Sequence, residues 1–167
     1  MPEEPGAGDG LSHLDSSGAA RMVDVGAKPV TSRQARAGAW VEMSPSTLDL
    51  IASGDVPKGD VFSAARIAGI MAAKNTHHLV PLCHALKIDS VSVEFEVDRP
   101  GSRLGIQAVA RASDRTGVEM EALLAVSIAA LTVYDMCKAV DRGMEITGVR
   151  LMSKSGGRSG AWEREER

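Results

Sequence analysis

The sequence predicts an α+β domain in which helices pack on one face of a single four-stranded antiparallel sheet. Three segments alternate apolar and polar residues with the two-residue period of a half-buried strand, and a fourth short apolar segment follows the longest helix. Helical patterns lie between the first and second strands and between the third and fourth. The 167 residues, 44% hydrophobic and 25% charged, are typical of one globular domain.

The chain has a short extended segment at residues 22–25, and its first full strand follows at residues 33–43. In that strand small or apolar residues face one way, while polar residues and a tryptophan face the other. Ser44 is suited to cap a helix at its N-terminus, and Pro45 fits the first helical position. We therefore expect a short helix that ends near Gly54.

Two longer helices are predicted. Asp60 has the character of an N-cap for a helix over residues 61–78, which ends before Pro81. The small residues of this helix permit close packing against another element. The longest helix covers residues 118–140 and is followed by Gly143, a residue that favours the end of a helix.

The remaining strands form a hairpin and a final strand. Residues 91–97 and 104–110 alternate on either side of a turn at Pro100-Gly101, which predicts an antiparallel hairpin with one solvated face. A last strand covers residues 146–151. This order of elements predicts a ferredoxin-like sandwich whose first crossover holds two helices.

The ends of the chain differ in composition from its middle. Residues 1–10, acidic and rich in Pro and Gly, predict a disordered tail without signal-peptide character, residues 11–160 one domain, and residues 161–167 a flexible tail. We find no run apolar and long enough to span a bilayer. Cys83 and Cys137 form no CxxC pair, so a reduced, cytoplasmic protein is expected. A net charge of −3 and only 3% aromatic residues argue against nucleic-acid binding.

Asp135 and Lys138 are three residues apart on the longest helix and share one face. This spacing alone favours a surface ion pair, whereas partial burial would let the lysine bind phosphate or donate a proton. Glu119 and Glu121 lie in the first turn, where carboxylates stabilise the helix dipole. Glu121 precedes Asp135 by 14 residues, or about 21 Å along the axis. A site that uses both ends of this apolar helix therefore needs a second subunit.

Two glycine-containing segments carry cations that suit an anionic ligand. Lys58-Gly59-Asp60 precedes a helix N-terminus, whose free N–H groups and dipole favour an anion, although a solvated loop lysine is an equal alternative. Residues 154–160 combine cations with glycines that let the backbone approach a ligand, although a frayed tail is the simpler interpretation. Neither segment is a Walker A loop.

Histidine occurs in two places. In Leu82-Cys83-His84, the imidazole is suited to contact a ligand or carry a proton. The neighbours His77-His78 point about 100° apart on a helix, and no third ligand has a suitable spacing. The sequence therefore predicts no metal site and no cofactor, and a role for magnesium at phosphate groups stays open.

Seven segments, in order along the chain, carry a resemblance to a known family. They are Met22-Val23-Asp24-Val25, Lys58-Gly59-Asp60-Val61-Phe62, Ala65-Arg66-Ile67-Ala68-Gly69-Ile70, Pro81-Leu82-Cys83-His84, Thr116-Gly117-Val118-Glu119-Met120-Glu121-Ala122-Leu123, Tyr134-Asp135-Met136-Cys137-Lys138-Ala139 and Lys154-Ser155-Gly156-Gly157. They resemble the MoaC family, the cyclic pyranopterin monophosphate synthases of molybdenum cofactor biosynthesis, from about Leu11 to Gly160.

The resemblance implies an activity and an assembly. The family converts 3′,8-cyclo-7,8-dihydro-GTP into cyclic pyranopterin monophosphate and releases pyrophosphate. It also implies a ferredoxin-like fold and a homohexamer, built as a trimer of dimers, with the active site at a subunit interface. No membrane partner follows from it.

The resemblance also implies roles for individual residues. Lys58 and Lys138 would be the main catalytic lysines, and Asp135 the acid beside Lys138. The substrate pocket would be lined by Leu82, Cys83, His84, Met120 and Glu121. Further polar positions that match the family are Asp24, Arg33, Lys74, Glu119 and Lys154. Where the family usually has a proline after the histidine, this chain has Ala85, which removes no chemical group.

Two other functions stay open from the sequence. A non-catalytic module of the same fold would bind RNA or a regulatory nucleotide, but the strands carry few aromatic residues on which bases stack. Alternatively, the chain is an oligomerisation partner that supports another enzyme. Activity of the purified protein alone separates this alternative from catalysis.

Overall fold

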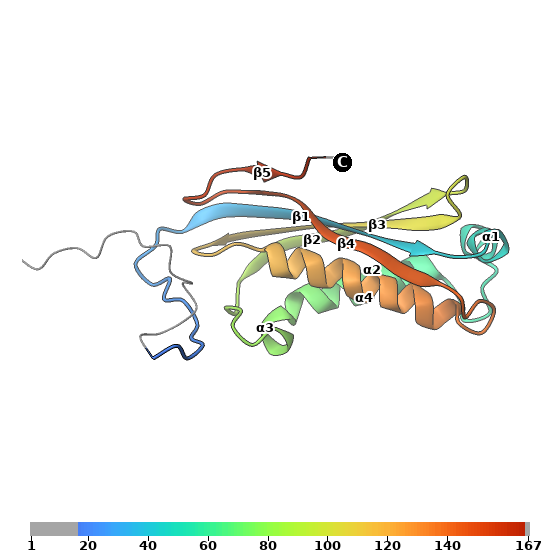
Figure 1. Cartoon of the computed structure of the whole chain (residues 1–167), viewed down its shortest axis with the longest axis horizontal. Coiled ribbons are helices and arrows are strands. Elements are labelled where there is room, and N and C mark those ends of the chain that lie inside the picture. The colour runs from blue at the N-terminus through green and yellow to red at the C-terminus, as the bar shows by residue number, and fades with distance from the viewer. Residues whose placement is uncertain (1–16, 166–167) are drawn as a thin grey trace, which may run out of the picture.

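The computed structural model describes residues 17–165 of the chain. One antiparallel sheet forms a layer, and the helices cover one of its faces (Figure 1). The predicted α+β fold with ferredoxin-like layers is confirmed, although the sheet has five strands where four were expected. The tail predicted at residues 1–10 lies outside the described residues.

The strands lie in the order β2-β3-β1-β4-β5. The central strand β1 (Thr31–Glu42) pairs with β3 (Arg103–Asp114) on one side and with β4 (Glu145–Ser155) on the other. β2 (Ile88–Asp98) completes the predicted hairpin with β3. Because all pairs are antiparallel, the start of β1 lies beside the ends of β3 and β4. Segments that are far apart in the sequence therefore meet at that end of the sheet.

A fifth strand lies within the C-terminal segment that was predicted to be a flexible tail. β5 (Trp162–Glu163) pairs with Ser153 and Lys154 of β4. The backbone N–H of Arg164 also donates to the carbonyl of Met152 at 2.8 Å. Two residues are too few to show a strand period, so the sequence pattern did not indicate this pairing.

The core lies between the sheet and two long helices. Alternate residues of the strands face the helices and are buried, among them Ala35, Ala37, Ala39, Val41, Ile106 and Ala108. Most are small, so the helices lie close to the sheet. The helices also approach each other closely, because a Cβ atom on Gly69 would lie 2.9 Å from the carbonyl oxygen of Ala125. Only glycine fits at this crossing.

The first two helices begin at the residues predicted from the sequence. Ser44 caps α1 (Pro45–Ser53) by accepting a hydrogen bond from the N–H of Thr47 at 3.3 Å. Asp60 caps α2 (Val61–Lys74) by accepting one from the N–H of Ser63 at 3.0 Å. These caps satisfy N–H groups that have no partner within the helix.

The prediction of one helix over residues 61–78 is wrong, since α2 ends at Lys74 and a short α3 (Thr76–Leu79) follows. The side-chain amide of Asn75 donates to the carbonyl of Met71 at 2.8 Å, and the Thr76 hydroxyl donates to that of Ala73 at 3.0 Å. These side chains satisfy carbonyls in the last turns of α2 and so compete with continuation of the helix.

The longest helix, α4 (Glu119–Cys137), ends three residues before the predicted limit at residue 140. The Asp141 carboxylate accepts hydrogen bonds from the N–H groups of Ser44 and Gly143, which turns the chain toward β4. By length and composition α4 is apolar enough to cross a membrane, which differs from the prediction that the chain has no such run. Its buried face packs on the sheet and on α2, as the core helix of a globular domain does.

Candidate active site

Three charged side chains meet at the C-terminal end of α4. Asp135 lies in the last turn and Lys138 caps the helix, while Lys58 belongs to the loop before α2. The ammonium of Lys138 lies 2.7 Å from Asp135 Oδ1. The ammonium of Lys58 lies 3.0 Å from Asp135 Oδ2 and donates to the Asp135 main-chain carbonyl at 2.8 Å. The predicted pair is thus a triad, and the second lysine comes from another element.

The two lysines determine the charge state of the carboxylate. Hydrogen bonds from Lys138 and then Lys58 hold the pKa of Asp135 below its usual value. The Asp135 carboxylate in turn raises the pKa of Lys138. All three side chains are about half exposed, so they remain open to a ligand. The triad carries a net charge of +1 and offers a protonated lysine as a phosphate ligand or proton donor.

A second group of charges lies at the N-terminal end of α4. The Lys154 ammonium lies 3.0 Å from Glu119 Oε1, and both side chains are partly buried. Glu121, two residues further along α4, is 3% exposed. Burial and then the charge of Glu119 raise the pKa of Glu121 to about 7. A carboxyl group with this pKa exchanges protons near neutral pH, as a general acid or base must.

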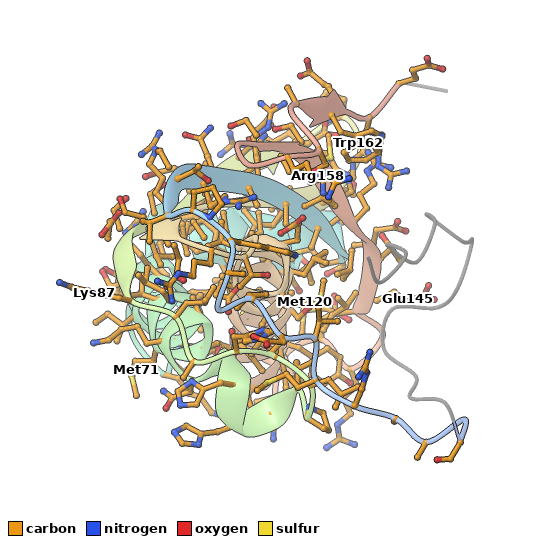
Figure 2. All side chains as sticks on the ribbon, turned by 90° about the vertical axis from the view of Figure 1, so that its left-hand side faces the viewer. Met71, Lys87, Met120, Glu145, Arg158 and Trp162 are labelled. Atoms are coloured by element: carbon orange, nitrogen blue, oxygen red, sulfur yellow. The ribbon has the colours of Figure 1, made fainter. Side chains whose placement is uncertain are left out.

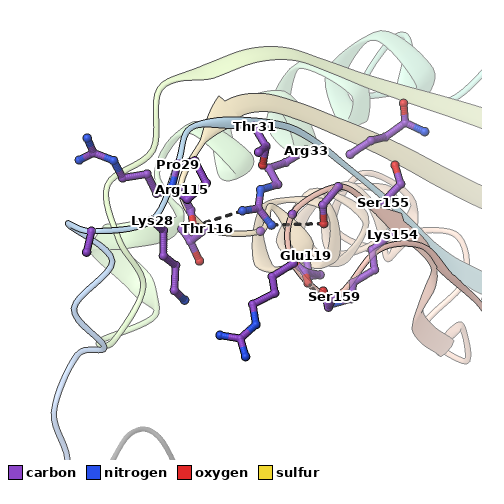
Figure 3. A pocket seen from close by; sticks show the side chains of 16 residues that line it. Lys28, Pro29, Thr31, Arg33, Arg115, Thr116, Glu119, Lys154, Ser155 and Ser159 are labelled. Carbon is purple, nitrogen blue, oxygen red and sulfur yellow. Dashed lines mark hydrogen bonds and ion pairs between the residues drawn. The ribbon is translucent and has the colours of Figure 1, made fainter. Parts of the chain in front are cut away.

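A cavity of about 900 Å³ opens beside the Glu119–Lys154 pair (Figure 3). Arg33 lies in its wall, and its guanidinium donates to the carbonyls of Asp114 at 3.4 Å, Arg115 at 3.3 Å and Gly156 at 3.3 Å. These three carbonyls belong to the last residue of β3, to the β3–α4 connection and to the segment after β4. Arg33 therefore holds together two walls of the cavity.

A smaller pocket of about 450 Å³ adjoins this cavity, and both have Glu119 in their lining. The residues predicted to contact substrate line the smaller pocket, namely Leu82, Cys83, His84, Met120 and Glu121. His84 Nε2 lies 2.8 Å from the carbonyl oxygen of Val23, which fixes the ring against the N-terminal segment. Burial and then the Glu121 charge raise the pKa of the Cys83 thiol, so this thiol is not an activated nucleophile.

Comparisons with known proteins identify the family of the chain. The model of the MoaC family matches residues 22–157, most of the chain. The chain belongs to the MoaC family. The cyclic pyranopterin monophosphate synthase of Chloroflexus aggregans is 62% identical over 161 residues, which cover 96% of this chain and 98% of that protein. The synthase of Pelotomaculum thermopropionicum is 58% identical, covering 93% and 91%. Cyclic pyranopterin monophosphate synthase 3 of Mycobacterium tuberculosis is 61% identical, covering 93% and 88%.

The candidate site residues of this MoaC protein fall into separate places within one chain. The lysine triad lies at one end of α4 and the two pockets at the other, with Glu121 and Asp135 about 21 Å apart along the helix axis. Lys74 lines a further cavity of about 300 Å³, which shares Leu86 with the lining of the smaller pocket. Asp24 is exposed and accepts a hydrogen bond from the N–H of Gly26. Its neighbours Val23 and Val25 line the smaller pocket.

The structure also brings to the 900 Å³ cavity three cations that the sequence does not mark as site residues. Lys28, Arg115 and Arg158 line it together with Arg33 and Lys154. The first three form no ion pair within residues 17–165. Arg158 lies in the glycine-rich segment 154–160, whose cations suit an anionic ligand. Lys28 and Arg115 belong to no segment of this kind. The cavity thus has five cations against one carboxylate.

Proposed function

We propose that this MoaC protein is a cyclic pyranopterin monophosphate synthase that converts 3′,8-cyclo-7,8-dihydro-GTP into cyclic pyranopterin monophosphate and releases pyrophosphate. The observation that carries the proposal is the cation-lined cavity joined to a pocket with a buried carboxyl group. The chain aligns with nearly the whole length of relatives that carry this name. A triphosphate and a purine-derived ring need two such adjoining compartments.

The cavity suits the phosphate end of the substrate. Five cations against one carboxylate compensate the charge of a triphosphate. They also stabilise the negative charge that develops on pyrophosphate as it leaves. Arg33 contributes mainly by position, because its guanidinium already binds three carbonyls.

The smaller pocket suits the base-derived ring. The guanidine-like edge of the purine donates hydrogen bonds and pairs with a carboxylate. Glu119 is bound to Lys154, so Glu121 is the carboxyl group left for the ring. With a pKa of about 7, Glu121 both accepts and returns protons while the ring is rebuilt.

The lysine triad would complete the site from a second copy of the chain. A two-fold pair of antiparallel α4 helices places the C-terminal end of one beside the N-terminal end of the other. The outward faces of the helices are apolar enough for such contact, with Leu131 54%, Ile67 60% and Met71 58% exposed. Figure 2 shows Met71 on the helix side of the molecule, away from Trp162 of the sheet edge. A hexamer built from three such dimers is the assembly we propose, and a monomeric mass in solution would contradict it.

A cytoplasmic location is part of the proposal. Both cysteines are free, with Cys137 buried and Cys83 half-buried. Free thiols in this number are usual where the compartment is reducing.

The proposed activity is tested with purified protein and 3′,8-cyclo-7,8-dihydro-GTP. The wild-type chain should form product without another protein, and Lys138→Ala should reduce turnover at least about 100-fold while the fold is kept. Lys87→Ala is the matched control, because Lys87 is exposed and lies at the opposite edge from Arg158 (Figure 2). Near-normal turnover by the Lys138 variant would remove this residue from the mechanism, and no turnover by the wild type would refute the activity.

A further inference from the structure

The end of α4 is tied to the start of α1 by one carboxylate. Asp141, in the loop between α4 and β4, accepts hydrogen bonds on Oδ2 from the Ser44 N–H at 2.9 Å and from the Thr47 hydroxyl at 3.2 Å. Its Oδ1 accepts one from the N–H of Gly143 at 3.0 Å. The Asp141 N–H donates to the carbonyl of Cys137, the last residue of α4, at 3.0 Å. Asp141 therefore joins the first turn of α1, the end of α4 and the chain that leads to β4.

The contact between Asp141 and α1 is partly shielded from water. Thr47 is 2% exposed, and its Oγ1 lies 2.8 Å from the hydroxyl of Ser44. The hydrogen bond from the Ser44 N–H is the main cause that holds the pKa of Asp141 below its usual range, so the carboxylate is ionised at neutral pH. A hydrogen bond to an ionised acceptor is roughly twice as strong as one between neutral groups.

One path leads from this contact through α1 to Lys58. The loop after α1 is bonded back to the helix, because the N–H of Asp55 donates to the Leu50 carbonyl at 3.1 Å. Within the loop, the N–H of Gly59 donates to the carbonyl of Val56 at 2.9 Å, and Val56 is 4% exposed. Lys58 thus stands on a loop that is anchored both to the end of α1 and in the core.

A second, shorter path leads from Asp141 to Lys138, three residues earlier in the chain. The Lys138 N–H donates to the Tyr134 carbonyl at 2.9 Å, and the Tyr134 hydroxyl donates to the carbonyl of Arg142 at 3.2 Å. Figure 1 shows α1 and the end of α4 at the same end of the molecule. Both lysines that bind Asp135 are therefore connected to Asp141 through bonded segments.

We propose that Asp141 is a positioning residue of the active site, whose carboxylate fixes the place of Lys58 relative to Asp135 and Lys138 by tying α1 to the end of α4. Asp141 acts through the lysines, because both of its carboxylate oxygens are occupied by hydrogen bonds within the chain. A catalytic group displaced by about 1 Å can lose a large part of its effect on the rate. The proposal rests on the proposed function only in taking the lysine triad as catalytic.

The position of Lys58 can be measured without turnover, by carbodiimide cross-linking near neutral pH. The reagent joins a carboxylate to an amine in contact with it, and peptide mass spectrometry quantifies the amide formed. The wild type should link Lys58 to Asp135, whose charged atoms lie 3.0 Å apart. Asp141→Ala should lower the yield of this link about fivefold, through loss of the hydrogen bonds that hold α1. The link between Glu119 and Lys154, also 3.0 Å apart, is the internal control and should keep its yield.

Matched variants on α1 test the same link with Asp141 left in place. Thr47→Val removes the hydroxyl that binds Asp141 and should lower the yield of the Lys58–Asp135 link about threefold, whereas Thr47→Ser keeps a hydroxyl and should restore it. Asp49→Ala is the control on the same helix, because Asp49 pairs with Arg99 of the β2–β3 turn. It should give the wild-type yield. If Asp141→Ala does not fold, the two Thr47 variants decide the question.

Kinetics show whether the position of Lys58 matters for turnover. With 3′,8-cyclo-7,8-dihydro-GTP, Asp141→Ala should lower kcat about tenfold and leave KM within about twofold, because the substituted residue holds catalytic groups and not the pockets. In a Lys58→Ala background, Thr47→Val should change kcat less than about 1.5-fold, because its effect acts through Lys58.

Three results would overturn the proposal. They are an unchanged Lys58–Asp135 link in a folded Asp141→Ala variant, an equal fall in the yields of both cross-links, and an unchanged kcat beside a lowered Lys58–Asp135 link. The cross-link is independent of turnover. A wild type that shows the expected cross-links and forms no product would therefore lose the proposed function, while Asp141 would still set the position of Lys58.

Discussion

Lys58 and Asp135 are in direct contact although 77 residues separate them in the sequence, with the lysine ammonium 3.0 Å from the carboxylate. The contact joins the loop before α2 to the last turn of α4. It exists because α2 and α4 pack closely, at a crossing that admits only Gly69 against Ala125. The geometry of the lysine triad thus depends on packing in the helix layer.

Replacement of Asp135 by Asn should lower the pKa of Lys138. The carboxylate raises that pKa in the wild type, and a neutral amide removes the charge while keeping the shape. A lysine that donates a proton is active below its pKa, so the alkaline limb of the kcat profile should move to lower pH in Asp135→Asn. Turnover measured across the alkaline range checks this. A limb at the wild-type position would show that Lys138 is not the proton donor.

Glu121 should make the folded state less stable as pH rises. Its pKa is about 7 in the folded protein against an ordinary value of 4.5, so the folded state binds the proton more tightly than the unfolded chain does. Its contribution is full below pH 4.5 and is lost as pH rises through 7. The free energy of unfolding of Glu121→Gln, measured in denaturant, should therefore lack this fall. Glu145→Gln, at an exposed site on β4, should retain it; equal pH profiles for wild type and Glu121→Gln would contradict the assignment.

Arg33→Lys should loosen the walls of the phosphate cavity. Lysine keeps the charge, but its single ammonium cannot reach the three carbonyls that the guanidinium binds. We expect a loss of about 1–2 kcal/mol in the free energy of unfolding together with a raised KM. Thermal unfolding and steady-state kinetics measure the two effects. A variant that keeps its stability and loses only affinity would indicate a direct substrate contact instead.

The fold was predictable where a local pattern carries the information. The two-residue period of β1 and the caps Ser44 and Asp60 are written in neighbouring residues, and the structure confirms them. β5 and the break at Asn75 were missed, because a two-residue strand has no period and one side-chain amide ends a helix without a change in hydrophobic pattern.

The site was predictable in part for the same reason. Asp135 and Lys138 share a helix face at a spacing of three residues, so their contact follows from helix geometry. The addition of Lys58 follows only from the packing of α2 on α4. Likewise, Lys28 and Arg115 become cavity residues because the antiparallel sheet brings the start of β1 to the end of β3. No property of the single residues marks them in the sequence.

The central claim is that each active site combines the lysine triad of one chain with the pockets of another. It is tested most directly by co-expressing two inactive chains, one with Lys138→Ala and one with both Glu121→Gln and Lys154→Ala, and measuring turnover of the mixed assembly. If the site is shared, random pairing restores about one quarter of wild-type activity, since each site needs an intact half from each chain. If the mixed assembly stays as inactive as either parent, the site lies within one chain and the account is contradicted.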